Sequence, residues 1–589
     1  MDKIEVLRTL FGHGEFREGQ EALIDALLAG RDALGIMPTG GGKSVCYQVP
    51  AMMLPGTALV ISPLISLMKD QVAALKAAGI PAAFLNSTLT PSQQGLALQR
   101  AREGQYKLIY VAPERLDAPS FRAYAAQASI SLIAVDEAHC VSQWGQDFRP
   151  NYLRIAAFIA SLPQRPPVGA FTATATQRVR EDIVSLLGLR SPARVITGFD
   201  RPNLYYEIIP VRWHREHVLY SVLSGLRGRS GIVYCATRKN VEKVCERLRD
   251  KGFAATRYHA GLDEAERRRN QEDFQFDRAE IMVATNAFGM GIDKSNVSFV
   301  IHYNMPMSVE AYYQEAGRAG RDGSESDCVL LFSMQDAVTA RRLITDREPN
   351  PELTPAQREE IIRQDLRRLQ DMIRLCQGTG CIREELLRYF GQPAGKPCGH
   401  CSRCAPPRYP EARVIGQSER MDLDIRRRLR HLNGENAPLP DAEKAQEDAL
   451  FERLRACRMD IARERGVPPY IICHDTSLRE MAKKKPRTPE ALKAVYGMGE
   501  RKAADFGARF LTVITGQQVE APPSVPEPPA EPLPVSEAAD TGWTPEEIRR
   551  LHDAWYLGRS MREIAGSLGR DRAEVLLKAD DLGLLAPKP

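Results

Sequence analysis

The 589-residue chain lacks an apolar segment long enough to cross a membrane, which takes roughly 18 or more consecutive apolar residues. Its longest apolar stretch, Ala58 to Met68, is interrupted by Pro63. The N-terminal segment carries Asp2 and Glu5 and lacks the basic, apolar and small-residue regions of a secretory signal peptide. We therefore expect no membrane contact and a cytoplasmic location.

The chain also lacks a large excess of charge of one sign. Its 80 Lys and Arg residues nearly balance 75 Asp and Glu residues, so the formal net charge is only +5. This balance excludes nucleic-acid binding through bulk charge, and any such binding must come from local patches. The composition of 43% hydrophobic and 26% charged residues excludes wholesale disorder, and the length predicts about four domains.

Cysteine is scarce and unevenly placed. Most of the 12 cysteines are scattered, several within apolar segments where a thiol packs as a small hydrophobe. Four cluster in two overlapping C-x-x-C units and one upstream position: Cys381, Cys398, Cys401 and Cys404. In a reducing cytosol a cluster favours a metal over disulfides, and four sulfurs favour Zn²⁺, with an iron–sulfur cluster as the alternative. His400 is a further candidate ligand, whereas Cys376 is expected to be a buried thiol.

Short apolar segments typical of buried strands alternate with amphipathic stretches between residue 30 and about residue 335. The first series is DALGIM, TALVIS, KLIYVAP, SLIAVDE and PVGAFTA. The second is SGIVYCA, FAATRYH, AEIMVAT, VSFVIHYN and SDCVLLF. Two series of βα units predict two doubly wound parallel-sheet lobes, joined near Asp200–Asn203 in the turn sequence GFDRPN.

The rest of the chain is predicted to be mainly helical. Ile362, Leu366, Leu369 and Ile373 recur at helical spacing before the cysteine cluster. Residues 516–540 include a proline-rich linker, and the final segment has a candidate three-helix core of Trp543, Leu551, Trp555, Ile564 and Leu568, with a turn at Gly569. We predict divisions at residues 1–200, 201–340, 341–405, 406–446, 447–515, 516–540 and 541–589.

Strand DALGIM leads into PTGGGKS and an apolar helix, which is the setting of a phosphate-binding loop. Thr39, Gly40, Gly41 and Gly42 form the predicted cradle for an ATP phosphate chain. Lys43 would reach the β- and γ-phosphates, and Ser44 would hold Mg²⁺. The strict pattern has glycine where this chain has Met37, and the alternative is a glycine-rich turn without a ligand.

A second strand, SLIAVDEAH, ends in two adjacent carboxylates. Asp136 at the strand end would join the Mg²⁺ shell, and Glu137 would orient or deprotonate the attacking water. The alternative, a solvated strand end, loses weight because the phosphate-binding loop precedes the pair in the expected order.

These motifs and several others resemble the RecQ family of superfamily 2 helicases. The others are FGHGEFREGQ, SPLISLMKDQ, VAPERL, FTATAT, VYCATR, VATNAFGMGIDK and QEAGRAGRDG. The resemblance covers residues 1 to about 405 and again 447–515. It implies two RecA-like lobes, a structural zinc on the four cysteines, and an adenine site in which Arg17 and Gln20 contact the base edge while His13 stacks on the ring.

The segment QEAGRAGRDG predicts an arginine finger. Arg318 and Arg321 are three residues apart, which would place them on one face. A guanidinium of the second lobe can neutralise the γ-phosphate only when the lobes close. We assign the finger to Arg321, with Arg318 beside it; a solvated basic helix is the alternative.

An aromatic segment, CVSQWGQDFRPNY, follows the paired carboxylates. Trp144, Phe148 and Tyr152 are four residues apart, as in a helical core stripe, but Gly145 and Pro150 disfavour a helix. Aromatic side chains with Arg149 beside a nucleotide site suit stacking on bases. In the RecQ family the matching loop senses single-stranded DNA, and the resemblance gives that role to Trp144, Phe148 and Arg149.

The C-terminal half departs from the family pattern. Only residues 405–446 separate Cys404 from the next module, which is too short for the family's usual winged-helix domain and its strand-splitting hairpin. Residues 447–515 resemble an HRDC domain with a candidate DNA-binding patch at Lys483, Lys484 and Lys485; a solvated lysine run is the alternative. Residues 541–589 resemble a helix-turn-helix with balanced charge, so protein and DNA docking are equally open.

The sequence as a whole predicts an ATP-dependent DNA helicase with Mg²⁺ and Zn²⁺ as cofactors. The family resemblance implies 3′–5′ translocation on single-stranded DNA and unwinding of forked duplexes. It also implies a role in repair and recombination at the bacterial nucleoid, with single-strand-binding or repair proteins as partners. The alternatives are an RNA helicase, disfavoured by the aromatic segment and the cysteine cluster, and an ATP-switched DNA-binding or annealing platform or translocase with weak unwinding.

Overall fold

The computed structural model describes residues 2–145, 147–288, 294–347, 353–393, 397–419, 442–516, 547, 551, 561–570 and 574–575. The chain forms two compact units, Met1–Pro522 and Pro523–Pro589. Within the described residues, no helix combines the length and apolar character needed to cross a bilayer.

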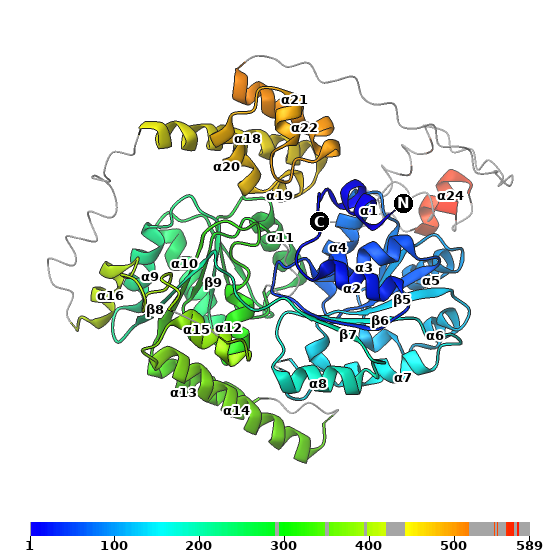
Figure 1. Ribbon diagram of the computed structural model, residues 1–589, viewed down its shortest axis with the longest axis horizontal. Coiled ribbons are helices and arrows are strands. Elements are labelled where there is room, and N and C mark those ends of the chain that lie inside the picture. The colour runs from blue at the N-terminus through cyan, green and yellow to red at the C-terminus, as the bar shows by residue number, and fades with distance from the viewer. Residues whose placement is uncertain are drawn as a thin grey trace. The chain divides into compact units, whose positions relative to one another are not determined.

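The first sheet has seven parallel strands in the order β3-β4-β2-β5-β6-β1-β7 (Figure 1). Their bounds are β1 Ala33–Ile36, β2 Thr57–Ile61, β3 Ala82–Leu85, β4 Leu108–Val111, β5 Ile130–Val135, β6 Val168–Thr172 and β7 Ala193–Ile196. The sequence predicts the five inner strands. It misses β3 and β7 because these short strands lie at the sheet edges, where burial is incomplete and the apolar signal is weak.

Helices cover both faces of this sheet and bury two apolar layers against it. They are α1 Lys3–Phe11, α2 Gln20–Leu28, α3 Lys43–Met53, α4 Ile65–Ala77, α5 Pro91–Arg102, α6 Pro119–Ala125, α7 Arg154–Ala160 and α8 Gln177–Leu186. Three short 3₁₀ turns complete the lobe: η1 Pro113–Arg115, η2 Ala138–Val141 and η3 Pro150–Leu153. The strands are buried on both faces, which is why they read as continuous apolar segments.

The second sheet has six parallel strands in the order β10-β11-β9-β12-β13-β8. Their bounds are β8 Leu204–Pro210, β9 Gly231–Tyr234, β10 Ala255–Tyr258, β11 Ile281–Ala284, β12 Phe299–His302 and β13 Ser326–Phe332. The accompanying helices are α9 Arg215–Ser224, α10 Arg238–Asp250, α11 Glu264–Gln275, α12 Val309–Ala316 and α13 Met334–Thr345. The two parallel sheets confirm the predicted α/β class with two doubly wound lobes.

Strand β8 is absent from the sequence prediction, and the structure explains its unusual composition. Glu207 on β8 is fully buried, yet its carboxylate accepts from Arg413 Nε at 2.8 Å and from the Tyr205 hydroxyl at 3.0 Å. Arg413 belongs to α16 (Pro410–Gln417), which packs on β8 and α9. The described part of the segment after the cysteine cluster therefore completes the second lobe at its edge strand.

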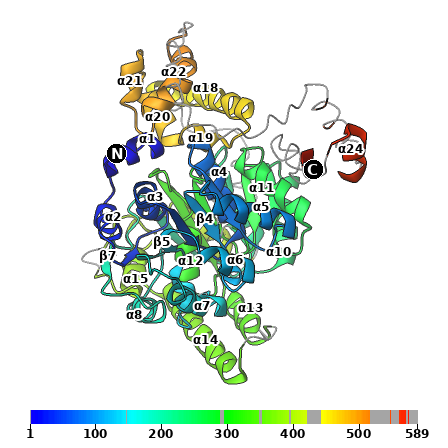
Figure 2. The ribbon, with the colours of Figure 1, turned by 90° about the vertical axis from the view of Figure 1, so that its right-hand side faces the viewer.

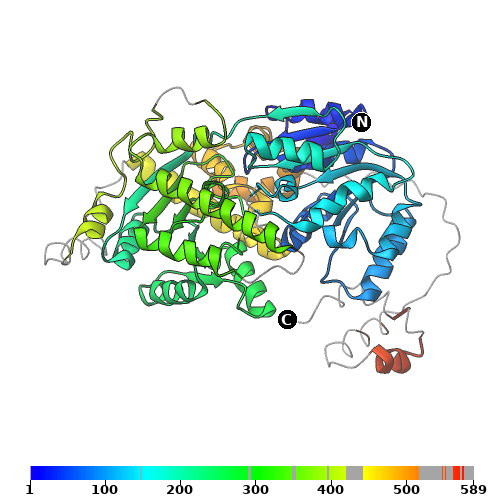
Figure 3. The same cartoon turned by 90° about the horizontal axis from the view of Figure 1, so that it is seen from below.

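The helical region between the second sheet and the cysteine cluster contains α14 (Pro355–Gln377) and α15 (Ile382–Tyr389). Helix α14 packs along α13, as Figures 1 and 3 show. Of the predicted helical stripe, Leu369 is buried in the second-lobe core, and Ile362, Leu366 and Ile373 pack against it. Cys376 is a buried thiol, as predicted.

Five helices form the next module (Figure 2): α18 Ala442–Arg465, α19 Pro469–Ile472, α20 Asp475–Lys484, α21 Pro489–Lys493 and α22 Glu500–Thr515. They enclose a separate apolar core that includes Leu454, Leu478 and Phe510. The module therefore has a hydrophobic core of its own.

In the second compact unit, the structure describes α24 (Met561–Leu568) and a few further residues. Leu551 and Ile564 are fully buried, Leu568 is half-buried, and Gly569 has a φ of +65° at the predicted turn. Trp543 and Trp555 lie outside the described residues.

Candidate nucleotide, nucleic-acid and metal sites

The glycine-rich loop joins β1 to α3, as the sequence predicts. Gly40 and Gly42 each have a φ of +79°, a conformation that glycine adopts without a steric penalty. Lys43 begins α3 and its Nζ donates to the Met37 carbonyl at 3.3 Å. Burial lowers the pKa of Lys43, against the opposing effect of Glu137 and Asp136. The loop therefore presents a helix N-terminus and a desolvated ammonium group, which together suit a phosphate chain.

The paired carboxylates stand at the end of β5, in different environments. Asp136 is buried, and burial together with neighbouring Glu137 raises its pKa to about 7. For Glu137, burial is outweighed by His139, Lys43 and Arg318, which lower its pKa to about 2. Glu137 has a φ of +46°, which is a strained backbone conformation for a residue other than glycine. Such strained residues cluster at functional sites. Glu137 is thus the ionised member of the pair, and its carboxylate can accept a hydrogen bond from a water.

The N-terminal motif lies directly against the glycine-rich loop. Gln20 is buried, and its Nε2 donates to the carbonyls of Gly41 at 3.3 Å and Gly42 at 3.1 Å. Arg17 Nη1 donates to the Gly40 carbonyl, and Gln20 Oε1 accepts from the Arg17 backbone N–H at 2.8 Å. His13 is exposed at the same edge, where partial desolvation, Arg17 and Lys502 lower its pKa. In this structure Arg17 and Gln20 brace the loop, and their predicted contacts with adenine stay predictions.

The two arginines of QEAGRAGRDG lie in turns after α12, which ends at Ala316. The glycine-rich segment leaves the helix before both arginines, so the alternative of a solvated basic helix does not hold, and the assignment of Arg321 as the finger with Arg318 beside it stays a prediction. A Cβ built on Gly40 would lie 3.5 Å from Arg321 Cγ, and one built on Gly317 would lie 2.9 Å from Thr39 Oγ1. The arginine turn of the second lobe thus packs directly on the glycine-rich loop of the first lobe.

A side-chain hydrogen bond also joins the lobes near this point. Gln314 on α12 donates from Nε2 to Thr174 Oγ1 at 3.1 Å. Thr174 belongs to the predicted motif FTATAT, which begins in the last residues of β6. Motifs from both lobes therefore meet around the same loop.

The aromatic segment after the carboxylates is a loop between two 3₁₀ turns, which agrees with the expectation that it is not a regular helix. Trp144 is half-buried, and the Arg178 guanidinium carbon lies 3.2 Å from the centre of its ring. Arg149 Nη1 donates to the Pro63 carbonyl at 2.9 Å, and its Nη2 pairs with Asp147 at 2.8 Å. Sequence reasoning missed Arg178 because it follows a different strand.

Tyr152 has a different role from the other aromatic residues of this segment. It is fully buried, and its hydroxyl donates to the backbone carbonyl of Asp136 at 2.9 Å. Tyr152 therefore connects the end of the aromatic loop to the carboxylates at the end of β5.

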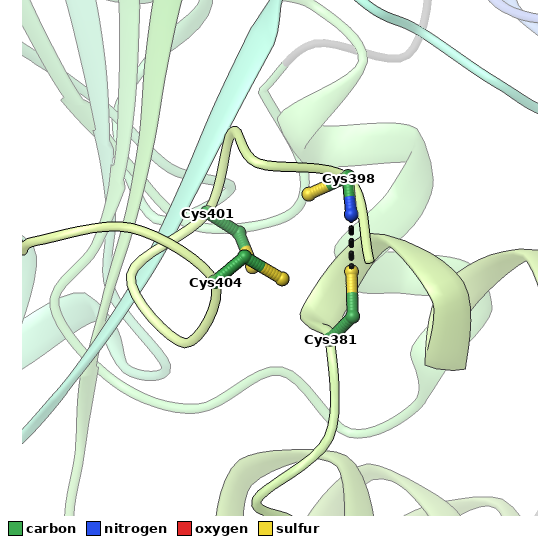
Figure 4. Close-up of side chains that lie close together, drawn as sticks. All are labelled: Cys381, Cys398, Cys401 and Cys404. Carbon is green, nitrogen blue, oxygen red and sulfur yellow. Dashed lines mark hydrogen bonds between the residues drawn. The ribbon is translucent and has the colours of Figure 1, made fainter. Parts of the chain in front are cut away.

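The four clustered cysteines converge (Figure 4), and their sulfurs all lie within 4.8 Å of one another. Sulfurs around one zinc lie about 3.8 Å apart when each Zn–S bond is ~2.3 Å, so the arrangement fits that ion. Cys381 caps α15, and its Sγ accepts from the backbone N–H groups of Glu384 and Cys398, each at 3.5 Å. His400 instead packs edge-on against the Tyr205 ring, 5.6 Å away.

Four families of known proteins match successive parts of the chain. Residues 17–183 match the DEAD/DEAH box helicase family, and residues 214–323 match the helicase conserved C-terminal domain. Residues 334–405 match the RecQ zinc-binding family, and residues 447–514 match the HRDC domain.

Two bacterial relatives align along nearly their whole length. The ATP-dependent DNA helicase RecQ of Bacillus subtilis is 39% identical over 586 residues, which covers 86% of this chain and 98% of the relative. The protein of the same name from Pasteurella multocida is 37% identical over 599 residues, covering 87% and 93%. The chain belongs to the RecQ family of helicases. The cysteine cluster is accordingly the core of a RecQ zinc-binding module, and the chain is an enzyme of the helicase class.

The HRDC domain of this RecQ-family helicase contacts both lobes. His474 Nδ1 lies 2.7 Å from the hydroxyl of Ser295 in the second lobe. Arg458 is fully buried, pairs with Asp475 at 2.6 Å and lies 3.9 Å from Asp277 of the second lobe. A Cβ built on Gly499, at the start of α22, would lie 3.6 Å from the Gly12 carbonyl of the first lobe.

The predicted lysine patch lies at the C-terminal end of α20. Lys483, Lys484 and Lys485 are exposed, and Lys484 pairs with Glu480. The patch is therefore accessible to a phosphate backbone, while the Gly499 turn faces the first lobe.

Proposed function

We propose that this RecQ-family helicase hydrolyses ATP to translocate 3′–5′ on single-stranded DNA and to unwind forked duplexes. It would act in DNA repair and recombination, in the bacterial cytoplasm at the nucleoid. The observation that carries the proposal is the contact between Arg321 of the second lobe and Gly40 in the loop of the first. Since a nucleotide bound there would touch both lobes, its hydrolysis would change how the lobes pack. Single-strand-binding or repair proteins are the proposed partners.

The ATP site would use side chains of both lobes. Lys43 and the loop N–H groups, with Thr39, would bind the phosphates, and Arg17, Gln20 and His13 would hold the adenine. Ser44 and Asp136 would hold Mg²⁺, which neutralises phosphate charge when bound. Glu137, kept ionised by His139 and nearby cations, would orient or deprotonate the attacking water. Arg321, with Arg318 beside it, would stabilise charge on the γ-phosphate.

The aromatic loop would couple DNA to this chemistry. Trp144 and Phe148 would stack on bases, and Arg149 would contact the strand. Movement of the loop would reach the carboxylates through Tyr152, whose hydroxyl donates to the Asp136 carbonyl at 2.9 Å. This path supports the DNA-stimulated ATPase expected of a translocating helicase.

One experiment separates the proposed helicase from an ATP-switched DNA-binding or annealing platform. Forked-duplex unwinding and single-strand-stimulated ATP hydrolysis are measured on the same preparation, with Lys43→Ala as the inactive control. The proposal expects both activities in the natural chain and neither in the variant. Hydrolysis without strand separation would favour the translocase or platform alternative, and unwinding retained in Lys43→Ala would contradict the assigned ATP site.

A further inference from the structure

Arg201 lies in the segment between β7 and β8 that joins the two lobes, outside every site described above. Its guanidinium donates to four backbone carbonyls. Nη1 donates to Thr39 at 2.7 Å and to Gly317 at 3.2 Å. Nη2 donates to Ala319 at 2.9 Å and to Gly320 at 2.8 Å. The first acceptor belongs to the glycine-rich loop of the first lobe, and the other three belong to the arginine turn of the second.

Asn203 supports the same turn from the joining segment. Its Nδ2 donates to the carbonyls of Gly320 and Ser324, each at 2.9 Å. Gly320 has a φ of +58°, and a Cβ there would lie 2.4 Å from Asn203 Nδ2, so the turn and the joining segment are in close contact. Residues that precede β8 therefore hold the backbone of the turn that carries Arg318 and Arg321.

The zinc-binding module also holds the joining segment. Arg383 on α15 is buried, and its Nη1 pairs with Asp200 at 2.7 Å and donates to the Arg201 carbonyl at 2.5 Å. Its Nη2 donates to the Leu204 carbonyl at 2.5 Å. Helix α15 is capped by Cys381, one of the clustered cysteines. The N-terminal turn of α15 and the hydrogen bonds of Arg383 and Arg201 thus connect the cysteine cluster to the glycine-rich loop.

We propose that Arg201 is a positioning residue that sets the Arg318–Arg321 turn against the glycine-rich loop, and that Arg383 fixes Arg201 from the zinc-binding module. The proposal rests on the proposed ATPase, because it assumes that Arg321 acts on bound nucleotide. A planar guanidinium suits this role, since its fork can serve acceptors on two segments at once, whereas a lysine ammonium acts as a point charge.

The proposal predicts different effects on nucleotide affinity and on the rate of ATP hydrolysis. Within the described residues, Arg201 reaches the phosphate-binding loop only through the backbone carbonyl of Thr39, and Arg17 and Gln20 also hold that loop. Removing Arg201 should therefore leave nucleotide affinity nearly unchanged. The arginine turn would lose its alignment, and misplacement of a catalytic group by about 1 Å costs on the order of 100-fold in rate. A residue that merely stabilised the fold would instead lower both quantities together with the melting temperature.

The test uses the full-length chain with Arg201→Ala, Arg201→Lys, Arg383→Gln and Arg321→Ala. Arg194→Ala is the matched control, because Arg194 is an exposed arginine on neighbouring β7. The measurements are kcat for single-strand-stimulated ATP hydrolysis, the Kd of a fluorescent ATP analogue, zinc content and melting temperature. We expect kcat to fall roughly 10- to 100-fold in Arg201→Ala, with Kd changed less than about threefold and zinc retained.

Further outcomes decide the rest of the proposal. Arg201→Lys should recover only part of kcat, Arg383→Gln should lower kcat with zinc still bound, and Arg201→Ala combined with Arg321→Ala should be no slower than Arg321→Ala alone. A normal kcat in both Arg201 variants beside an impaired Arg321→Ala would overturn the role of Arg201 while leaving the proposed ATPase intact. A normal kcat in Arg321→Ala would instead overturn the assigned finger.

Discussion

At the scale of single residues, the site is defined by charged and polar side chains held in specific backbone settings. Glu137 occupies a left-handed conformation next to buried Asp136, and the two carboxyl groups have opposite pKa shifts. Trp144 is covered by Arg178 on one ring face.

The first prediction concerns the aromatic loop. Trp144→Ala and Arg149→Ala should reduce DNA-stimulated ATP hydrolysis more than basal hydrolysis, because each base stacked on an aromatic ring contributes about 1–3 kcal/mol. The measurement is the ATPase rate with and without single-stranded DNA. Arg122→Ala, at an exposed pair with Asp117, is the control and should change neither rate. Equal loss of the basal and stimulated rates would refute the coupling role.

At the scale of helices and strands, the zinc-binding module packs against strand β8 of the second lobe. The ring of Tyr205 on β8 contacts His400, and Tyr206 on the same strand forms an isolated bridge with Cys401. Cys381 caps helix α15, and Arg383 on this helix contacts the segment that joins the lobes. Loss of the metal should therefore affect the second lobe as well as the cysteines.

The second prediction tests this connection. Cys381→Ser should abolish stoichiometric zinc binding and lower the melting temperature, since structural zinc sites contribute directly to folding free energy. Zinc content by metal analysis and thermal unfolding by circular dichroism are the measurements. Cys376→Ser, at a buried thiol outside the cluster, is the control and should retain zinc. Full zinc occupancy in Cys381→Ser would contradict the four-cysteine site.

The third prediction concerns the end of α20 in the HRDC domain. Replacing Lys483, Lys484 and Lys485 with alanine should weaken single-stranded DNA binding at low salt. Each lost phosphate contact should reduce the slope of log K against log salt by about 0.7. Fluorescence anisotropy across a salt series measures this, with the exposed Lys493→Ala as control. An unchanged slope would identify the patch as a solvated lysine run.

At the scale of the whole molecule, the segment between the cysteine cluster and the HRDC domain is too short for the winged-helix domain that is usual in the RecQ family. The question is which part of the chain separates the DNA strands. The described part of that segment, through α16, packs on β8 and α9 of the second lobe. The expectation that the chain lacks the family's usual winged helix stays a prediction. One hypothesis is that the helix-turn-helix-like residues 541–589, which follow the proline-rich linker, replace the function of that domain in strand separation.

The fourth prediction addresses that replacement. Deletion of residues 541–589 should lower forked-duplex unwinding while sparing single-strand-stimulated ATP hydrolysis, because the ATP site lies in the other compact unit. Unwinding and hydrolysis are measured side by side on the truncated and full-length chains. Unchanged unwinding after the deletion would dispose of the idea.

Much of the molecule can be predicted from local sequence. The inner strands of both sheets are continuous apolar segments, and the glycine-rich loop and the DEAH motif follow strands β1 and β5 as expected. The cysteine spacing also predicts a cluster, because overlapping C-x-x-C units bring thiols together by local turns. The edge strands β3, β7 and β8 are missed, since partial burial or a buried charge such as Glu207 removes the apolar signal.

The sequence by itself determined which chemistry each segment carries: phosphate binding, paired carboxylates, stacking and four thiols. Only the tertiary structure decided which segments meet, placing Arg321 beside Gly40, Arg178 on Trp144, and Arg201 between the two lobes. The physical reason is clearest for Arg201. Its four acceptors are main-chain carbonyls, which every residue type carries, so no pattern of side chains in the sequence could have identified them.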